Sequence, residues 1–278
     1  MPRLTGESGR KAPIHRYGVL GWPVRHSRSP AMHRAAIAAL GLAGYAYQLL
    51  PVPPGLFAET VRALPAAGFA GANVTVPHKA AALALADDAT AAARAIGAAN
   101  TLTFGPGGAI AAANTDAPGL IAALGADPAG LQAIVLGAGG TARAAVWALR
   151  EAGAEVAVWS RRPEPARELA SDLGVRAIER PRAADLLVNA TTVGMDGYPS
   201  GADALRSLAL DTDLLRSCAR IIDFVYSSVP TALVATAREL GVPAVDGLEV
   251  LVAQGALSFE LWTGRRPPTE EMRAAARG

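Results

Sequence analysis

The chain has 278 residues, of which 51% are hydrophobic and 18% are charged, and its formal net charge is +2. This length suits one large or two ordinary domains, with ample apolar material for a buried core. A charge this small, without a basic stripe interleaved with aromatic residues, gives no case for nucleic-acid binding.

The cysteine count and the lengths of the apolar runs exclude further classes of protein. Cys218 is the only cysteine, which excludes an intrachain disulfide and a cysteine metal cluster and favours a structural thiol. No apolar run approaches the length of a membrane span. Residues 1–13 carry basic residues without the apolar stretch of a signal peptide, so we expect a flexible extension there. The composition is typical of a cytoplasmic protein.

Two serines follow the first expected strand, residues 15–21. Ser29 precedes Pro30 at the start of an alanine-rich segment that closes near Gly41, which predicts a helix with Ser29 as its N-cap. Capping does not account for Ser27, two residues earlier. The two hydroxyl groups and the helix N-terminus together predict a carboxylate site, with a purely structural turn as the alternative.

A polar strand face comes next. Asn73 and Thr75 alternate with valines, so both side chains lie on one face of an expected strand that Pro77 ends. Lys79 falls in the first turn of the following helix, where the helix dipole disfavours a positive charge. A solvated lysine is the ordinary interpretation, and the neighbouring Asn73 and Thr75 favour a functional one. Ahead of this segment we expect a strand over residues 45–50 and a helix over residues 56–64.

Two strands and a helix with an acidic start close the first half. Residues 97–103 and 109–114 are expected to form strands joined by a glycine-rich turn, after short helices between residues 80 and 94. Asp116 comes directly before a helix expected over residues 117–124. As an isolated fact, an N-cap is the better interpretation of Asp116, and a functional carboxylate is the alternative.

The second half begins with the motif G-x-G-x-x-A. Residues 133–136 are uninterrupted apolar residues, which predicts a strand buried on both faces, and an alanine-rich helix is expected over residues 141–151. Gly137 permits the tight turn, Gly139 lets backbone N–H groups approach a pyrophosphate, and Ala142 allows close packing of helix on strand. The phosphates would lie at a helix N-terminus, which favours anions. A glycine-rich turn without a ligand is the structural alternative.

The next strand, residues 155–159, ends at Ser160-Arg161-Arg162. In dinucleotide-binding domains, a residue that contacts the ribose stands at about this point. NAD enzymes place Asp or Glu there, whereas the 2′-phosphate of NADP calls for arginine. A solvated basic turn is the alternative interpretation. Because the fingerprint precedes it, we expect NADP as the cofactor.

The remaining segments continue the α/β pattern. Buried strands are expected over residues 185–189 and 220–226, the second ending at Tyr226. Ligands of open α/β sheets bind outside the carboxyl ends of the strands, which makes Tyr226 a candidate site residue. The last long helix, residues 248–263, carries Gln254 among apolar residues, so a buried Gln254 needs a polar partner. Helices are also expected over residues 163–173 and 231–240, with a strand over residues 175–178.

Taken together, these segments resemble the shikimate dehydrogenase family, in the family's order, from about residue 17 to residue 264. The matching motifs of the first half are Gly21 with Ser27-Arg28-Ser29-Pro30, Gly71-Ala72-Asn73-Val74-Thr75-Val76-Pro77-His78-Lys79, Ala99-Asn100-Thr101 and Asn114-Thr115-Asp116. Those of the second half are Gly137-Ala138-Gly139-Gly140, Asn189-Ala190-Thr191-Thr192-Val193-Gly194-Met195, Asp223-Phe224-Val225-Tyr226 and Asp246-Gly247-Leu248 running to Gln254. So many collinear matches are far more specific than the fingerprint alone.

The resemblance implies an α/β protein of two α/β domains: an N-terminal substrate domain with a mixed sheet and a Rossmann-like NADP-binding domain, with the active site in the cleft between them. Residues 14–118, completed by the C-terminal helices of residues 247–278, would form the substrate domain, and residues 119–246 the NADP-binding domain. The implied reaction is the reversible, NADPH-dependent reduction of 3-dehydroshikimate to shikimate in aromatic amino-acid and chorismate biosynthesis. No metal is implied, because the hydride comes from the cofactor. A monomer or homodimer would act without nucleic acid or membrane.

The resemblance also implies roles for individual residues. Lys79 and Asp116 would be the catalytic pair, because an ammonium beside a carboxylate can stabilise and protonate the alkoxide that develops when a ketone accepts a hydride. Which of the two carries the proton stays open at this point. Substrate-binding roles fall on Ser27, Ser29, Asn73, Thr75, Asn100, Tyr226 and Gln254. Cofactor-binding roles fall on Gly137, Ala138, Gly139, Gly140, Thr141, Ala142, Ser160, Arg161, Arg162, Thr191 and Gly247.

Three segments depart from the commonest family pattern: Ser160-Arg161-Arg162, the loop after Tyr226, and Glu249-Val250. They bear on loop geometry and hydroxyl preference and leave the fold unaffected. A quinate/shikimate dehydrogenase, often NAD-dependent, and an aminoshikimate-type dehydrogenase are therefore alternatives within the family. A non-catalytic NADP-binding regulatory protein on the same scaffold would be expected to lack Lys79 or Asp116.

Overall fold

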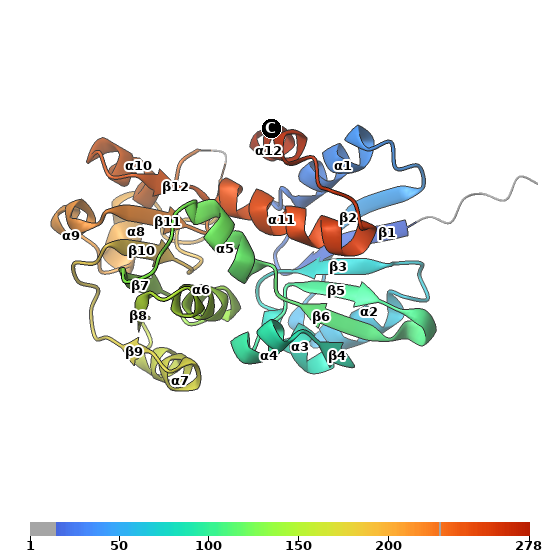
Figure 1. Cartoon of the computed structure of the whole chain (residues 1–278), viewed down its shortest axis with the longest axis horizontal. Coiled ribbons are helices and arrows are strands. Elements are labelled where there is room, and N and C mark those ends of the chain that lie inside the picture. The colour runs from blue at the N-terminus through green and yellow to red at the C-terminus, as the bar shows by residue number, and fades with distance from the viewer. Residues whose placement is uncertain (1–14, 228) are drawn as a thin grey trace, which may run out of the picture.

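The computed structural model describes residues 15–227 and 229–278, and the extension expected over residues 1–13 lies outside these ranges. Two six-stranded sheets, which we call sheet A and sheet B, organise two halves that lie side by side (Figure 1). Helices pack on both sheets, so each half is an α/β structure, as the sequence predicts.

Sheet A is mixed and has the strand order β2-β1-β3-β5-β6-β4. Its strands are β1 (His15–Gly21), β2 (Tyr45–Pro51), β3 (Gly71–Val74), β4 (Asp88–Ala89), β5 (Thr101–Phe104) and β6 (Ile110–Ala113). The accompanying helices are α1 (Ser29–Ala39), α2 (Phe57–Ala63), α3 (Lys79–Leu85) and α4 (Ala91–Ile96), with 3-10 turns η1 (Pro54–Leu56) and η2 (Pro106–Gly108). Because β1 and β3 are parallel, the loops that follow them leave the same edge of the sheet.

Strand β1, which lies between the edge strand β2 and β3, is buried on both faces. Leu20 packs with Phe57 and Val61 of α2 on one side of the sheet. Tyr17 and Val19 join a second cluster on the opposite side. A strand covered on both faces needs apolar residues at successive positions, which is why residues 17–20 show little alternation with polar residues.

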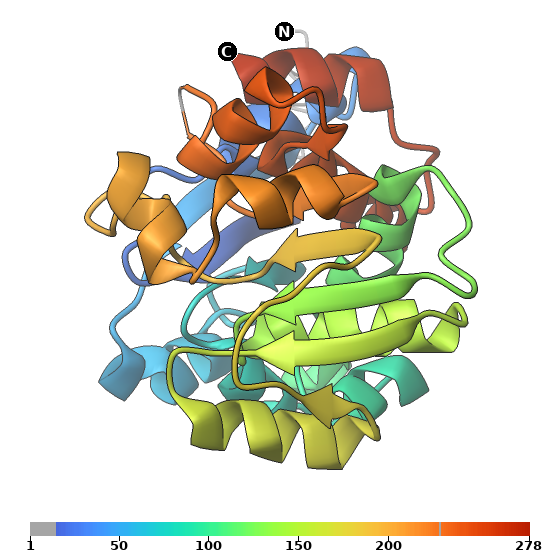
Figure 2. The same cartoon turned by 90° about the vertical axis from the view of Figure 1, so that its left-hand side faces the viewer.

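Sheet B is fully parallel, with the order β12-β11-β10-β7-β8-β9 that is typical of a doubly wound dinucleotide-binding fold (Figure 2). Its strands are β7 (Gln132–Leu136), β8 (Glu155–Trp159), β9 (Arg176–Ala177), β10 (Leu186–Asn189), β11 (Arg220–Asp223) and β12 (Ala244–Val245). Its helices are α5 (Asp116–Leu124), α6 (Gly140–Glu151), α7 (Pro163–Leu173), α8 (Gly201–Ser207), α9 (Thr212–Ser217) and α10 (Ala232–Glu239). The strand order reverses at β7 and β10, where such folds form their ligand crevice.

The last two helices return to the first half, and Figure 1 shows α11 running from one half to the other. They are α11 (Gly247–Thr263) and α12 (Thr269–Arg277). Near the start of α11, Val250 belongs to the core of sheet B. Farther along, Phe259 packs with Met272 of α12 and Met32 of α1, and Trp262 packs against β1. In the part of the chain that the structure describes, no helix has the length and apolar character needed to cross a membrane.

Two helix starts differ from the sequence-based prediction. Ser29 is already the first helical residue of α1, so its expected role as an N-cap is wrong. Thr115 occupies the cap position of α5 and Asp116 is the first helical residue, so the capping interpretation of Asp116 is wrong as well. The Ala117 N–H donates instead to Asn114 Oδ1 at 3.1 Å. The side chains of Ser29 and Asp116 thus serve contacts other than capping.

Several strands are shorter than predicted, most clearly β3, β5 and β11. β5 begins only at Thr101, because Gly97 is still the C-cap of α4. β3 ends at Val74, and the His78 N–H donates to the carbonyl of Thr75 at 3.0 Å, so a turn begins where the strand was expected to continue. β11 ends at Asp223, which leaves Tyr226 in the loop beyond it. The short elements β4, β12, α8 and α9 were not predicted, because two-residue strands and helices of six or seven residues carry too little periodicity to detect.

Candidate active site

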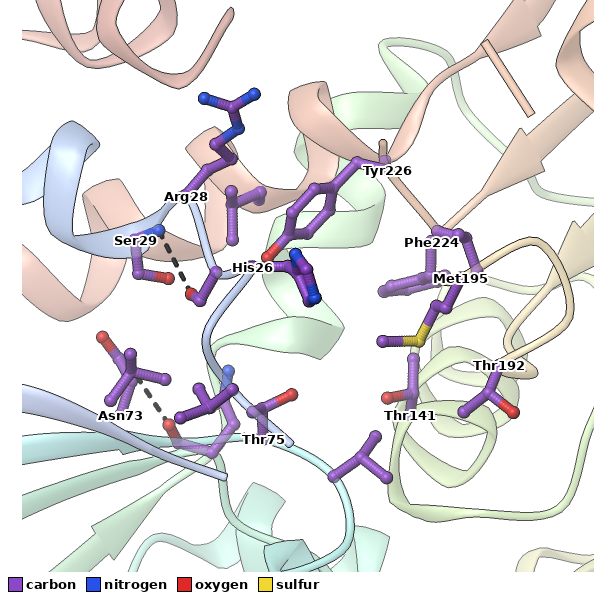
Figure 3. Close-up of a pocket in the computed structure, with 18 of the residues that line it drawn as sticks. His26, Arg28, Ser29, Asn73, Thr75, Thr141, Thr192, Met195, Phe224 and Tyr226 are labelled. Carbon is purple, nitrogen blue, oxygen red and sulfur yellow. Dashed lines mark hydrogen bonds between the residues drawn. The ribbon is translucent and has the colours of Figure 1, made fainter. Parts of the chain in front are cut away.

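A pocket of about 460 Å³ lies between the two halves. Its walls come from the loops after β1 and β3, the first turn of α6, the loops after β10 and β11, and the start of α11. Figure 3 shows Asn73 and Thr75 on one side of the pocket and Thr141, Met195 and Phe224 on the other. The pocket therefore joins strand ends of both sheets, which is where α/β proteins bind ligands.

Lys79 and Asp116 form a buried ion pair that lines this pocket. The Lys79 Nζ donates to Asp116 Oδ2 at 2.5 Å, and the two residues are only 9% and 5% exposed. Asp116 stands at the N-terminus of α5, where the helix dipole favours a carboxylate, and it offsets the unfavourable place of Lys79 at the start of α3. The ordinary interpretation of Lys79 as a solvated lysine is wrong.

Asn100 connects the ion pair to the last long helix. Its Nδ2 donates to Asp116 Oδ1 at 2.8 Å and to Gln254 Oε1 at 3.1 Å, and its Oδ1 accepts from the Thr115 N–H at 2.7 Å. The Gln254 Nε2 donates to the carbonyl of Leu251 at 2.9 Å. Gln254 thus has the polar partners that its burial requires, and both oxygens of Asp116 accept hydrogen bonds.

Close helix packing makes this network possible. A Cβ atom added to Gly119 of α5 would lie 2.7 Å from the Cβ and 2.9 Å from the Cα of Gln254 on α11. Only glycine lets the two helix backbones approach this far, because backbone atoms cannot rotate away as a flexible side chain can. Gly119 therefore controls the separation between Asp116 and Gln254.

We expect Gly119→Ala to separate α5 from α11. The free energy of unfolding should fall by about 1–3 kcal/mol, as for other overpacked cores, although alanine is the better helix former. The catalytic efficiency should fall as well, because Gln254 moves away from Asn100. Urea denaturation and steady-state kinetics measure the two effects. Gly55→Ala is the matched control, since a Cβ atom there meets no described atom within 4 Å; equal stability of the two variants would contradict the packing argument.

Asn73 is held by residues from α1 and β2. The Tyr47 hydroxyl donates to Asn73 Oδ1 at 2.7 Å, and the Tyr47 ring stacks on His33 with centroids 4.2 Å apart. Burial lowers the pKa of His33 to about 3, so this imidazole is neutral at physiological pH. With its oxygen occupied by Tyr47, the amide group of Asn73 keeps one orientation toward the pocket that it lines.

Four hydroxyl groups assigned to the substrate by resemblance line the same pocket: Ser27, Ser29, Thr75 and Tyr226. The backbone N–H of Ser29 donates to Ser27 Oγ at 3.3 Å, which holds the two serines together. Burial raises the pKa of Tyr226, so its phenol stays protonated and can donate. The two serines at the start of α1, together with the hydroxyl groups of Thr75 and Tyr226 in the same pocket, suit an anionic group such as a carboxylate.

A contact between the two halves joins two residues that line the pocket. The Nδ1 of His26, in the loop after β1, lies 3.3 Å from Asp196 Oδ2, in the loop after β10. The Nε2 of His26 accepts from the Arg25 Nε at 2.8 Å. Both members of the pair are more than half exposed, so the contact adds little stability but joins two loops that lie far apart in the sequence.

The glycines of the G-x-G-x-x-A motif have different structural roles. Gly137 has a φ of +116°, which L-residues rarely adopt, and it makes the tight turn after β7. A Cβ atom at Gly139 would meet no described atom within 4 Å, so its backbone faces open space at the start of α6. Gly140 lies against Lys79, whose Cβ would be 2.8 Å from an added Cβ atom. Ala138 lies between the two turn glycines, and Ala142 is fully buried, as close packing requires.

The basic turn after β8 lies beside the fingerprint turn. β7 and β8 are parallel neighbours that pair Leu136 with Trp159, so Gly137 and Ser160 follow at the same edge of sheet B. Ser160 is half-buried, whereas Arg161 and Arg162 are exposed. Two guanidinium groups in solvent at this edge suit a phosphate on the ribose of a dinucleotide.

The loops after β10 and β11 are held by one buried carboxylate. Asp223 accepts from Asn189 Nδ2 at 2.9 Å, from the Val225 N–H at 2.9 Å and from the Thr231 hydroxyl at 2.6 Å. Burial raises the pKa of Asp223 to about 6. The Asn189 Oδ1 in turn accepts from the Thr191 hydroxyl at 2.7 Å, which fixes the predicted residue Thr191 on the pocket wall.

The predicted residue Gly247 also lines the pocket. A Cβ atom at this position would lie 2.5 Å from the carbonyl oxygen of Val225 and 2.6 Å from that of Phe224. Glycine is therefore required for α11 to begin against the loop that follows β11. The site residues predicted near this loop, Thr191, Tyr226 and Gly247, all lie on the pocket wall.

Sequence reasoning missed Tyr47 and the role of Asp223. Tyr47 carried no signal beyond strand alternation, whereas an aspartate ending a buried strand was a signal that could have been used. The departure at Glu249 has a structural explanation. Its carboxylate accepts from Arg273 Nε at 3.0 Å and from Arg277 Nη2 at 2.7 Å, both on α12. Val250, and not Glu249, lines the pocket.

Two stretches of the chain match protein-family profiles. Residues 19–102 match the shikimate dehydrogenase substrate binding domain, and residues 247–277 match the shikimate 5'-dehydrogenase C-terminal domain. Shikimate dehydrogenase (NADP(+)) of Methylobacterium radiotolerans is 46% identical over 273 residues, which cover 92% of this chain and 94% of that protein.

Solved structures give the same picture. Shikimate 5-dehydrogenase of Thermus thermophilus, in complex with NADP(H) and shikimate, is 41% identical, with a TM-score of 0.85 over 95% of this chain and 99% of that chain. The ligand-free form of 5-ketofructose reductase of a Gluconobacter species is 29% identical, with a TM-score of 0.80 over 95% of this chain and 98% of that chain. The same architecture thus occurs in a protein named for a different substrate.

Proposed function

This chain belongs to the shikimate dehydrogenase family, and we propose that it catalyses the reversible, NADP-dependent reduction of 3-dehydroshikimate to shikimate. The observation that carries the proposal is a hydrogen-bonded network of Lys79, Asp116, Asn100 and Gln254. These residues line the same pocket as the hydroxyl groups of Ser27, Ser29, Thr75 and Tyr226. A cyclic polyol with one carboxylate needs both kinds of contact.

The residues of sheet B fit NADP. The backbone of Gly139 faces open space at the N-terminus of α6, where a pyrophosphate has room and backbone N–H donors. Arg161 and Arg162 stand at the end of β8 to pair with a 2′-phosphate, and Thr191 and Gly247 line the pocket. When bound, NADPH supplies the hydride for the carbonyl carbon of the substrate.

Residues from both halves that line the pocket hold the ring. Ser27, Ser29, Thr75 and Tyr226 bind the carboxylate, because Ser27 and Ser29 lie at the start of α1 and Thr75 and Tyr226 line the same pocket. Asn73, Asn100 and Gln254 bind ring hydroxyl groups through amides that other residues already orient. Preorganised polar groups of this kind distinguish hydroxyl patterns strongly, because a missing hydroxyl leaves a buried group unpaired.

Lys79 supplies the proton. As the carbonyl carbon accepts the hydride, the C=O π electrons move to oxygen, and a Lys79 N–H transfers its proton to that oxygen. The ammonium also stabilises the developing negative charge. Asp116 accepts with both oxygens, so it orients Lys79 and does not compete as the donor. Solvent returns a proton to the neutral amine afterwards.

One chain supplies every residue in this assignment, so we propose that a single chain is the catalytic unit, as a monomer or homodimer in the cytoplasm. Residues 14–118 and 247–278 form the substrate domain, and residues 119–246 form the NADP-binding domain. The core shared by α1, α11 and α12 supports this division.

The test is NADPH formation followed at 340 nm with shikimate, quinate and an aminoshikimate, each with NADP+ and NAD+. We expect turnover with shikimate and NADP+ to exceed every other pair. Faster oxidation of quinate or of the amino-substituted ring would favour the corresponding paralogue. Tight NADPH binding without turnover of any pair would support the non-catalytic alternative.

We expect Arg161→Ala to weaken the binding of NADP+ but not the binding of NAD+. The KM for NADP+ should rise by about tenfold or more, because a charge-assisted contact to the 2′-phosphate is lost, while kcat at saturation stays near the wild-type value. The KM for NAD+, which lacks that phosphate, should not change. Arg167→Ala on α7, an exposed arginine paired with Glu164, controls for loss of charge. A parallel rise in both KM values would contradict the assignment.

A further inference from the structure

Lys79 is held by hydrogen bonds to two helices. Besides the bond to Asp116, its Nζ donates to the Thr141 hydroxyl at 2.8 Å. Thr141 is the second residue of α6, the helix of the fingerprint, and Figure 3 shows its side chain on the wall of the pocket. Asp116 is the first residue of α5, so the ammonium is anchored on two separate helices.

The stem of Lys79 lies against the same turn of α6. A Cβ atom at Gly140 would be 2.8 Å from the Cβ of Lys79 and 3.2 Å from its Cδ. The glycine therefore lets the lysine pass close to the α6 backbone before its end group meets Thr141. This contact is tight and nearly dry, because Lys79 is only 9% exposed.

The two bonds fix the direction of the third donor. An ammonium group has three N–H donors in tetrahedral geometry. Asp116 and Thr141 take two of them from two directions, so the remaining N–H has one orientation. With Asp116 alone, the ammonium could turn about the axis of a single hydrogen bond. The arrangement is what a proton donor needs when its partner atom must lie in one place.

We propose that the Thr141 hydroxyl is a positioning residue that aims the free N–H of Lys79 at the substrate oxygen. This inference rests on the proposed function, since it assigns Thr141 to the proton-transfer step of that reaction. It differs from the cofactor-binding role that the resemblance implies for Thr141. The hydroxyl accepts from the lysine, so its oxygen is engaged on the side of sheet A.

The two roles make opposite kinetic predictions. If the hydroxyl only binds the cofactor, its removal raises the KM for NADP+ and leaves kcat nearly unchanged. A hydroxyl that positions Lys79 acts on the chemical step, so its loss lowers kcat at saturating NADP+ and shikimate. The division between kcat and KM therefore separates them.

The experiment compares Thr141→Val with Thr141→Ser. Valine keeps the shape and removes the hydroxyl, whereas serine keeps a hydroxyl in the same first turn. We expect kcat to fall about tenfold in the valine variant, the usual size for a lost hydrogen bond to a charged group, and to recover to within about twofold in the serine variant. The NADPH dissociation constant, from fluorescence titration, should change less than about twofold in both.

A double variant tests whether Thr141 acts through Lys79. In a Lys79→Ala background, Thr141→Val should cause no further loss of kcat, because the lysine that it positions is gone. The same tenfold loss in that background, or a loss confined to the KM for NADP+, would overturn the inference. So would a valine variant with wild-type kcat. An inactive wild type would instead overturn the proposed function, so the two failures are distinguishable.

Discussion

Lys79→Ala should lower kcat for shikimate oxidation by about a thousandfold or more, because one residue supplies both a proton-transfer group and the charge that stabilises the alkoxide. Lys79 is nearly buried, and its Nζ donates to side chains on two helices. Initial rates at 340 nm with saturating shikimate and NADP+ measure the effect. NADPH binding should persist, since the fingerprint turn is unchanged.

The amino-acid usage of the chain adds weight to this prediction. It has 26 lysine and arginine residues, and only Lys11 and Lys79 are lysines. Arginine stays protonated under all physiological conditions and cannot act as a proton donor that is later refilled. Lys79→Arg, which keeps the positive charge, should therefore also lose most of its activity. Near wild-type turnover in Lys79→Arg would show that charge alone suffices and would contradict proton donation by Lys79.

Asp116→Asn should damage both activity and stability. Asparagine keeps the shape of the side chain but removes the charge opposite a buried ammonium, and loss of one partner from a buried pair costs about 3–5 kcal/mol. The side chains of Lys79 and Asp116 are only 11% and 8% exposed, so water compensates little. We expect kcat to fall by about a hundredfold or more, because Lys79 loses its strongest orienting contact.

Urea denaturation separates the two effects of this substitution. Combining Lys79→Met with Asp116→Asn removes the unpaired charge, so the double variant should regain part of the lost stability while it stays inactive. If the single variant were as stable as wild type, the pair would not be the buried ion pair described above. If the double variant were less stable than the single variant, charge burial would not be the cause of the loss.

The regular parts of this fold could be predicted because their signals are local. The apolar run from Ala133 to Leu136 and the glycines after it indicate a buried strand and a tight turn without reference to any other segment. The strand and turn formed as predicted, with Gly137 at φ +116°. The mixed sheet of the first half and the two-domain α/β organisation were confirmed as well.

The parts that could not be predicted depend on distant contacts. Ser29 and Asp116 were assigned to caps from their neighbours in sequence, whereas Asp116 bonds to Lys79 and Asn100, 37 and 16 residues away. Glu249 departs from the commonest family pattern, and its neighbours in sequence do not explain why. The explanation is its ion pairs with Arg273 and Arg277 of α12. The roles assigned to the individual site residues stay predictions until the variants above are measured.

The return of α11 and α12 to sheet A also governs how the newborn chain matures. The strands of sheet A are synthesised before those of sheet B, yet the cluster that covers α1 needs Phe259 and Met272, which are synthesised after all of sheet B. Sheet B is built from one continuous stretch, residues 132–245, and can close soon after it emerges. At synthesis rates of about 5–20 residues per second, the apolar face of α1 stays uncovered for about ten to fifty seconds. The half that is translated first is therefore completed last. During that interval the exposed apolar face of α1 is the surface that a chaperone would bind.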